Sequence, residues 1–338
     1  MISLAVKYRP TEWDQVTEQK SVVQILQRQI DVNEIKNVYL FAGATGCGKS
    51  TLARLFANKI NKGVGQPIEI DAASNNGVDN IRSIIKSAQE RSIDSKYKIF
   101  IIDETHALTN QAWQAFLKCL EEPPQYTIFI FCTTDPQKIP ATILNRVQRF
   151  NISKISYDGI KNRLKYICDQ EHFTNYDEAI EYIAKIADGG MRDAIALLEK
   201  AASLATDLSI SNVLTALGNY SYQSFFRLAN ALIDGDERTI FEIIDTYYKN
   251  GNDLKIFIDQ YLSFSIDLMK YSIFKTCDIL QIPKSFEADL IHTISIENAS
   301  KYFKYVMNKL FELKSAIKND TNIKSTIEVS FIQLGRCE

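Results

Sequence analysis

The segment Gly43-Ala44-Thr45-Gly46-Cys47-Gly48-Lys49-Ser50 matches the pattern G-x-x-x-x-G-K-[ST]. An apolar run, residues 38–42, precedes it, and a stretch of helical character, residues 48–61, follows it. This order predicts a phosphate-binding loop, because glycines let backbone N–H groups turn toward an anion and the helix N-terminus adds positive potential. In such a loop Lys49 neutralises the β- and γ-phosphates and the Ser50 hydroxyl binds Mg²⁺. Chance produces the pattern in about one chain in a hundred from background residue usage, and its place between a strand and a helix disfavours chance further.

A second polar cluster follows the apolar run of residues 99–102, where Asp103 and Glu104 stand side by side. We expect them at the end of a strand that neighbours the phosphate loop. One carboxylate there can hold Mg²⁺, and the other can orient and polarise an attacking water. Adjacent acidic residues are otherwise most often a solvated surface pair, but the phosphate loop favours the functional interpretation. Thr133 and Thr134 end a further predicted strand, and a hydroxyl there can sense a γ-phosphate, although a threonine at a strand end is also ordinary.

The hydrophobic pattern divides the chain into an α/β part and a helical part. Strand-length runs at residues 38–42, 68–70, 99–102 and 128–133 alternate with helical patterns at residues 48–61, 78–90 and 110–121. This alternation predicts a parallel sheet with helices on both faces. Beyond about residue 152 the periodicity is helical. We therefore expect three domains, at residues 1–154, 155–218 and 219–338.

Composition and charge indicate a globular protein. The 338 residues are 46% hydrophobic and 24% charged, and 39 Lys+Arg against 41 Asp+Glu give a net charge of −2. This excludes a disordered or collagen-like chain and a uniformly basic surface, so contact with nucleic acid requires a local basic patch. The absence of a C-x-x-C pair predicts that the chain has no zinc site and that its cysteines are mostly reduced core residues. We expect a cytoplasmic protein, since the N-terminus does not resemble a signal peptide and the apolar runs are too short to cross a membrane. The cysteines are Cys47, Cys119, Cys132, Cys168, Cys277 and Cys337.

Motifs spread over the first 205 residues share one resemblance. They are the phosphate loop and residues 7–10 (KYRP), 70–78 (IDAASNNGV), 102–104 (IDE), 117–124 (LKCLEEPP) and 133–138 (TTDPQK). Together they resemble the gamma/tau ATPase subunit of the bacterial DNA polymerase III clamp loader, a family within the AAA+ superfamily. The resemblance continues more faintly to residues 321–334. It implies a RecA-like AAA+ P-loop ATPase domain with a parallel sheet at 1–154, a three-helix lid at 155–218 and an all-α collar at 219–338 that holds subunits in a ring-like pentamer.

The resemblance also implies roles for single residues. Thr134 matches the sensor-1 position, Arg146 the arginine finger offered to a neighbouring subunit's ATP, and Arg192 the sensor-2 position of the lid. By their residue type alone, both arginines could equally pair with surface carboxylates. The implied catalytic set is Lys49, Asp103, Glu104, Thr134, Arg146 and Arg192. The implied nucleotide contacts are Arg9, Val16, Gly43, Gly46, Cys47, Gly48, Lys49, Ser50 and Thr51, with Ser50 and Asp103 on Mg²⁺ and with Arg82 and Lys118 facing DNA.

The chain departs from the family pattern at four places. Asn145 and Val147 flank Arg146, where the family has a serine and a cysteine, so the orientation of the guanidinium can differ. A short connection, residues 62–67, replaces a four-cysteine zinc module, which again predicts no zinc. The sequence ends after the expected collar, without a tau-type extension. Cys47 is unusual in the phosphate loop, and we hypothesise that its oxidation impairs ATP binding.

The expected function is ATP hydrolysis by a clamp-loader subunit that opens a sliding clamp and loads it onto primer–template DNA. The implied partners are further copies of the chain, delta- and delta-prime-like subunits, the clamp and DNA, with no membrane. One alternative is a non-hydrolysing structural subunit, which the presence of Lys49, Ser50, Asp103 and Glu104 disfavours. Another is a different AAA+ DNA-remodelling ATPase, which a winged-helix C-terminus would support. Residues beyond 219 instead show helical patterns, in which Tyr261, Phe264, Tyr271 and Phe274 are expected to form core rather than a base-stacking surface.

Overall fold

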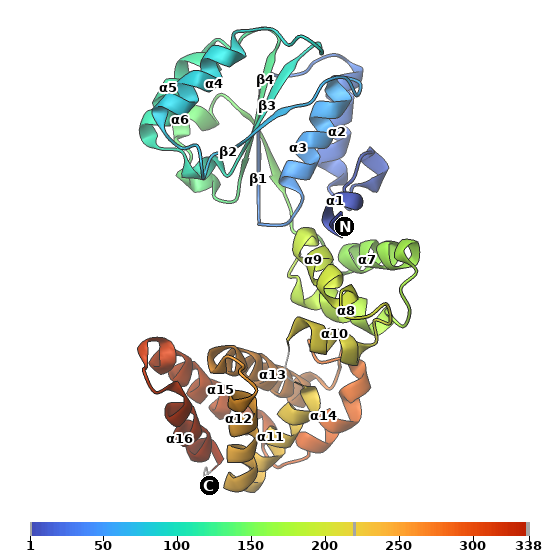
Figure 1. Ribbon diagram of the computed structural model, residues 1–338, viewed down its shortest axis with the longest axis vertical. Coiled ribbons are helices and arrows are strands. Elements are labelled where there is room, and N and C mark those ends of the chain that lie inside the picture. The colour runs from blue at the N-terminus through green and yellow to red at the C-terminus, as the bar shows by residue number, and fades with distance from the viewer. Residues whose placement is uncertain (1, 219–220, 336–338) are drawn as a thin grey trace. The chain divides into compact units, whose positions relative to one another are not determined.

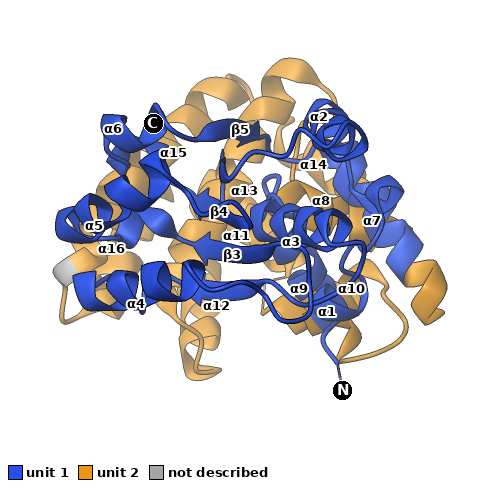
Figure 2. Ribbon diagram, turned by 90° about the horizontal axis from the view of Figure 1, so that it is seen from above, with its two compact units in different colours: residues 1–167, 187–199 blue, residues 168–186, 200–338 orange. Residues whose placement is uncertain are grey.

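The computed structural model describes residues 2–218 and 221–335 (Figure 1). The chain divides into two compact units (Figure 2). Unit 1 contains residues 1–167 and 187–199, and unit 2 contains residues 168–186 and 200–338. The predicted domain boundary after residue 154 stays a prediction. The boundary after residue 218 falls at residues 219–220, which lie outside the described part of the chain.

Unit 1 is built on a five-stranded parallel sheet with the order β2-β3-β4-β1-β5. The predicted parallel α/β architecture is therefore confirmed. A fifth strand joins the four expected ones beside β1; its sequence, QRFNI, is too polar to stand out as an apolar run. Strand β4 lies between β1 and β3, so the strand that ends at Asp103 is not paired in the sheet with the strand that precedes the phosphate loop. The strands are β1 (Val38–Gly43), β2 (Ile68–Asp71), β3 (Lys98–Asp103), β4 (Thr127–Thr133) and β5 (Gln148–Ile152).

Helices cover both faces of this sheet (Figure 1). Helix α3 (Lys49–Ile60) and helix α5 (Asn110–Glu121) agree closely with expectation, whereas α4 (Val78–Ala88) ends two residues before the predicted residue 90. Helix α2 (Lys20–Asp31) was not expected. Shorter helical segments are α1 (Leu4–Lys7), η1 (Trp13–Gln15), η2 (Thr105–Ala107), η3 (Pro136–Lys138) and α6 (Ala141–Leu144).

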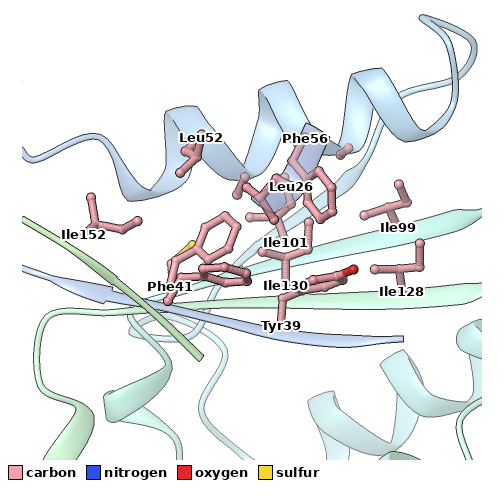
Figure 3. Packing of buried hydrophobic residues seen from close by; sticks show 14 of the residues in the cluster. Leu26, Tyr39, Phe41, Leu52, Phe56, Ile99, Ile101, Ile128, Ile130 and Ile152 are labelled. Carbon is pink, nitrogen blue, oxygen red and sulfur yellow. The ribbon is translucent and has the colours of Figure 1, made fainter. Parts of the chain in front are cut away.

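Successive strand residues alternate between two hydrophobic cores. Tyr39 and Phe41 of β1 pack with α2 and α3, where Leu52 and Phe56 cover them (Figure 3). Leu40, the residue between them, packs on the opposite face with α4 and α5. This is the two-residue period of a strand buried on both faces. It fixes α3 over the sheet and thereby fixes the phosphate loop at its N-terminus.

The helices that follow the sheet are shared between the two units. They are α7 (Tyr157–Glu171), α8 (Asp177–Ile186), α9 (Met191–Ala202) and α10 (Ile210–Leu217). The three helical patterns expected between residues 155 and 218 correspond to α7, α8 and α9, and α10 is an additional helix. The first eleven residues of α7 and the first nine of α9 belong to unit 1.

In unit 2, the described residues from 221 to 335 form helices joined by loops, with no strand among them. Its elements are α11 (Tyr222–Asp234), α12 (Glu237–Lys249), α13 (Leu254–Phe274), η4 (Lys284–Phe286), α14 (Glu287–Thr293), α15 (Ala299–Ala316), η5 (Ile317–Asn319) and α16 (Ile323–Gly335). Tyr261, Phe264 and Tyr271 are buried as expected. Phe274 is not, with 61% of its surface exposed, because α13 ends there and Lys275 takes a left-handed conformation. Within the described residues, no helix combines the length and apolar character needed to span a bilayer.

Shortening a core side chain tests this packing in unit 1. Ile130 on β4 is 0% exposed, whereas Ile93, in the loop after α4, is 99% exposed. Ile130→Ala should lower the free energy of unfolding by about 2–5 kcal/mol, because it removes buried methyl groups and leaves a cavity. Ile93→Ala, the same substitution in solvent, should change it by less than about 0.5 kcal/mol.

Tryptophan fluorescence during guanidinium unfolding is the measurement. It reports on unit 1 alone, since Trp13 and Trp113 are the two tryptophans of the chain. Equal midpoints for the two variants would contradict the described core.

Candidate functional site

The phosphate loop joins β1 to α3 in a conformation that requires glycine. Gly46 has a φ of 72° and Gly48 a φ of 101°, values that residues with a Cβ rarely adopt. Lys49 begins α3, and its ammonium group donates hydrogen bonds to the carbonyl oxygens of Gly43 (3.0 Å) and Ala44 (2.8 Å). Its side chain is thus folded back over the loop and 7% exposed. A positive charge and a helix N-terminus converge on the space inside the loop.

The Ser50 hydroxyl and the Asp103 carboxylate meet beside this loop. Ser50 Oγ donates a hydrogen bond to Asp103 Oδ2 at 2.5 Å, and the Glu104 backbone N–H donates to Asp103 Oδ1 at 3.0 Å. Although β4 separates β1 from β3, α3 packs against all three strands and brings Ser50 to Asp103. A hydroxyl and a carboxylate are oxygen ligands of the kind that Mg²⁺ prefers.

Glu104 lies next to Asp103 and contacts two further polar side chains. Its backbone is left-handed, with a φ of 48°. Thr134, immediately after β4, donates its hydroxyl to Glu104 Oε2 at 3.3 Å, and His106 Nδ1 lies 3.3 Å from the same oxygen. The structure thus brings together Glu104 and Thr134, both singled out from sequence. His106 was missed, although its position two residues after Glu104 was a usable signal.

A cavity of about 260 Å³ opens beside the loop, and its lining lies entirely in unit 1. Of the residues expected at the nucleotide, Gly43 is not in the lining and instead provides a carbonyl to Lys49. Sequence analysis missed Tyr8, Arg54, Arg163 and Met191, which also line the cavity. The expected residues in the lining are Arg9, Val16, Gly46, Cys47, Gly48, Lys49, Ser50, Thr51, Asp103, Glu104 and Arg192.

The cavity is rich in positive charge. Five cationic side chains and two acidic ones line it, a balance of 5 − 2 = +3. Burial lowers the pKa of Arg9, and the nearby positive charges of Arg54 and Arg192 lower it further. Arg163 donates to the Tyr8 carbonyl oxygen at 2.6 Å, and burial lowers its pKa too. Crowded cations of this kind suit a ligand with several negative charges.

Arg192 reaches this cavity from α9. Its backbone N–H donates to the Gly46 carbonyl oxygen at 3.4 Å, so the N-terminus of α9 adjoins the phosphate loop. The carboxylate of Asp193 also lies close to Gly46. The first turn of α9 therefore forms one wall of the cavity.

Arg146 lies outside the cavity. It donates to Glu121 Oε1 and to the Thr142 carbonyl oxygen, both at 2.5 Å, and a third of its side chain is exposed. The two residues expected at DNA also lie elsewhere. Arg82 is exposed on α4, where it contacts Asp79 at 3.1 Å, and Lys118 is exposed on the adjacent α5.

The described residues contain no group of three or more His, Cys, Asp or Glu side chains that could hold a metal ion. The expectation that the chain lacks zinc stays a prediction.

A parallel sheet of this order, with a phosphate loop after β1, an acidic pair after β3 and an arginine from a following helix at the cavity, defines an AAA+ P-loop fold. Among solved structures, the Thermotoga maritima RuvB Holliday junction branch migration motor is similar with a TM-score of 0.53 and 20% sequence identity. The match covers 67% of this chain and 79% of that one. At this identity the likeness concerns the fold alone.

Sequence comparison identifies the family. Residues 66–156 match the family described as DNA polymerase III, delta subunit, and residues 159–206 match the DNA polymerase III clamp loader subunit, ATPase lid domain. The Buchnera aphidicola (Schizaphis graminum) DNA polymerase III subunit gamma is 33% identical over 73% of this chain and 74% of its own length. The Bacillus subtilis subunit tau is 36% identical over 78% of this chain and 51% of its own length. This chain belongs to the gamma/tau family of DNA polymerase III subunits.

The chain spans about half the length of the first curated relatives it matches, 51% of the Bacillus subtilis subunit and 55% of the Mycoplasma genitalium gamma/tau subunit.

The environment of Cys47 predicts an unreactive thiol. Its side chain is 2% exposed, and burial raises its pKa. Thiolate is the reactive form, and a raised pKa means that less of it exists at any given pH. At pH 8, iodoacetamide should therefore label Cys47 at least about tenfold more slowly in the folded chain than in the urea-unfolded chain, as measured by peptide mass spectrometry. Equal rates would instead support the hypothesis that Cys47 is sensitive to oxidation.

Proposed function

We propose that this chain is an ATP-hydrolysing subunit of a clamp loader that opens a sliding clamp and loads it onto primer–template DNA. The observation that carries the proposal is the convergence of Lys49, the Ser50–Asp103 pair and Glu104, which accepts a hydrogen bond from Thr134, at one cavity. A subunit that served only as a scaffold would not need the Ser50–Asp103 pair or the Glu104 carboxylate at a cavity of this kind. Membership of the gamma/tau family supports the same function.

The residues at the cavity fit a magnesium nucleotide. Lys49, Arg9 and Arg192 supply positive charge for a triphosphate, and the N–H groups of the phosphate loop add donors. Ser50 and Asp103 would hold Mg²⁺, which neutralises charge that develops on the phosphates. The hydrogen bond between the two side chains already holds Ser50 Oγ next to Asp103 Oδ2.

Glu104 is the group that orients the attacking water and accepts its proton. It is a carboxylate at the cavity wall, and it is one residue beyond the proposed metal ligand Asp103. Thr134 contacts Glu104 from the end of β4, and we propose that it senses the γ-phosphate through that carboxylate. Arg192 would stabilise negative charge from the side of α9.

Arg146 would act on the nucleotide of a neighbouring subunit. It cannot serve its own cavity from the position it holds with Glu121 and the Thr142 carbonyl oxygen, which is outside the lining. A guanidinium supplied from a neighbour makes hydrolysis depend on assembly. Further copies of this chain and delta- and delta-prime-like subunits are the proposed neighbours.

DNA would contact the outer surface of α4 and α5. These helices pack against each other, and Arg82, Lys86 and Lys118 are exposed on them. Side chains of this type bind phosphates without reading bases, as a protein that acts at any primer–template junction requires. Work on replicating bacterial DNA would place the protein in the cytoplasm.

Removal of the Arg146 guanidinium tests the proposed action between subunits. Arg146→Ala should lower DNA-stimulated ATP turnover in the assembled complex by about 10³–10⁵-fold, because a finger arginine stabilises transition-state charge. Affinity for a fluorescent ATP analogue should stay within about twofold, since Arg146 is outside the cavity of its own chain. Arg149→Ala provides the matched control, because Arg149 is an exposed arginine three residues away that bonds to Asn151. Retained turnover in Arg146→Ala would rule out the finger role.

Salt dependence tests the proposed DNA surface. Lys118→Ala should reduce the slope of log K against log [salt] for primer–template binding by about 1, because each phosphate contact releases about one counterion. Lys20→Ala is the control, since Lys20 is an exposed lysine on α2, which covers the opposite face of the sheet. Fluorescence anisotropy with labelled DNA and an ATP analogue measures both slopes. Identical slopes for Lys118→Ala and the unmodified chain would exclude a phosphate contact by Lys118.

A further inference from the structure

One oxygen of the Glu104 carboxylate is held by two neighbours. Thr134 Oγ1 donates to Oε2 at 3.3 Å, and His106 Nδ1 lies 3.3 Å from the same atom. An imidazole N–H at this position can donate to a carboxylate. Two contacts on a single oxygen restrict rotation of the carboxylate about its last side-chain bond, which is otherwise soft.

The imidazole that makes one of these contacts is itself well anchored. His106 belongs to η2, whose first residue, Thr105, is fully buried and donates its hydroxyl to the Cys132 carbonyl oxygen at 3.1 Å. Thr133, also fully buried, lies 3.3 Å from His106 Nδ1 through its hydroxyl. The end of β4 thereby fixes the place of the imidazole relative to the sheet.

The backbone of Glu104 is constrained as well. Its left-handed conformation is one that a residue with a long side chain adopts only when its surroundings impose it. The Glu104 N–H donates to Asp103 Oδ1 at 3.0 Å, and its carbonyl oxygen accepts from Ala107 N–H at 2.9 Å. Constraint at the backbone and at one carboxylate oxygen leaves few positions for the other oxygen.

Glu104 lines the cavity, whereas His106 and Thr134 are not among the residues that line it. His106 therefore has no direct access to a nucleotide from this position. It can act on the reaction only through Glu104.

We propose that His106 is a positioning residue for hydrolysis, which holds Glu104 Oε2 so that Oε1 faces the attacking water. This inference rests on the proposed function. In the reaction, the water oxygen forms a bond to the γ-phosphorus, the bond from that phosphorus to the bridging oxygen of ADP breaks, and a proton of the water passes to Glu104. His106 gains and loses no proton in this step.

The experiment compares variants of the full chain in the assembled complex, with Mg²⁺-ATP and primer–template DNA. His106→Ala should lower kcat by about tenfold to 100-fold, because a misplaced general base loses its alignment, while affinity for an ATP analogue stays within twofold. His106→Asn should restore most of kcat, since its side-chain amide can place a donor where Nδ1 stands. His292→Ala, at an exposed histidine of unit 2, is the matched control and should equal the unmodified chain.

Combination with Glu104→Gln separates positioning from a merely structural role. If His106 acts through Glu104, adding His106→Ala to Glu104→Gln should cause no further loss of kcat. A further tenfold loss, or unchanged kcat in His106→Ala alone, would overturn the inference and leave the proposed function intact. A rise in turnover without DNA in His106→Ala would also overturn it, since it would show that His106 restrains Glu104. No turnover by the unmodified complex would overturn the proposed function itself, and this inference with it.

Discussion

The hydrogen bond between Ser50 and Asp103 joins the two halves of the candidate site. Ser50 belongs to the helix that leaves the phosphate loop, and Asp103 ends a strand that is not adjacent to the loop strand. The contact exists because α3 crosses the sheet far enough to pack on β1, β4 and β3. The site therefore depends on the hydrophobic core beneath α3. Displacement of this helix would separate the Ser50 hydroxyl from the Asp103 carboxylate.

Charge is distributed in the site so that cations surround the cavity and acids occupy one edge. Arg9 and Arg192 come from segments far apart in the sequence, yet Arg192 lies close enough that its charge lowers the pKa of Arg9, in addition to the effect of burial. Asp103 and Glu104 gather where β3 ends. Under our proposal, this polarity would orient a nucleotide with its phosphates toward the loop and its metal toward β3. Arg146 takes no part in it, which is why the site within one chain is incomplete for rapid hydrolysis under our proposal.

Much of this arrangement could be predicted from the sequence, because it depends on local patterns. The phosphate loop, four strands and the helix over residues 110–121 follow from apolar runs, glycines and prolines. The order of the strands does not, since no local pattern states which strand lies beside which, and the position of β4 between β1 and β3 could not be predicted. Strand β5 was missed because only two of its five residues are buried. Arg163 was missed because nothing near it in the sequence indicates its contact with the Tyr8 carbonyl oxygen, whereas the closeness of His106 to Glu104 in the sequence was a signal left unused.

ATP turnover by the chain with primer–template DNA and its clamp tests the central claim most directly. We expect DNA and clamp to stimulate phosphate release by the unmodified chain in its complex, and Lys49→Ala to abolish both that release and tight nucleotide binding. Lys49 contacts two carbonyl oxygens of the loop and lines the cavity, so its loss removes a positive charge from the phosphate loop itself. Equal stimulated turnover in both forms would contradict the account, because hydrolysis would then occur at another site.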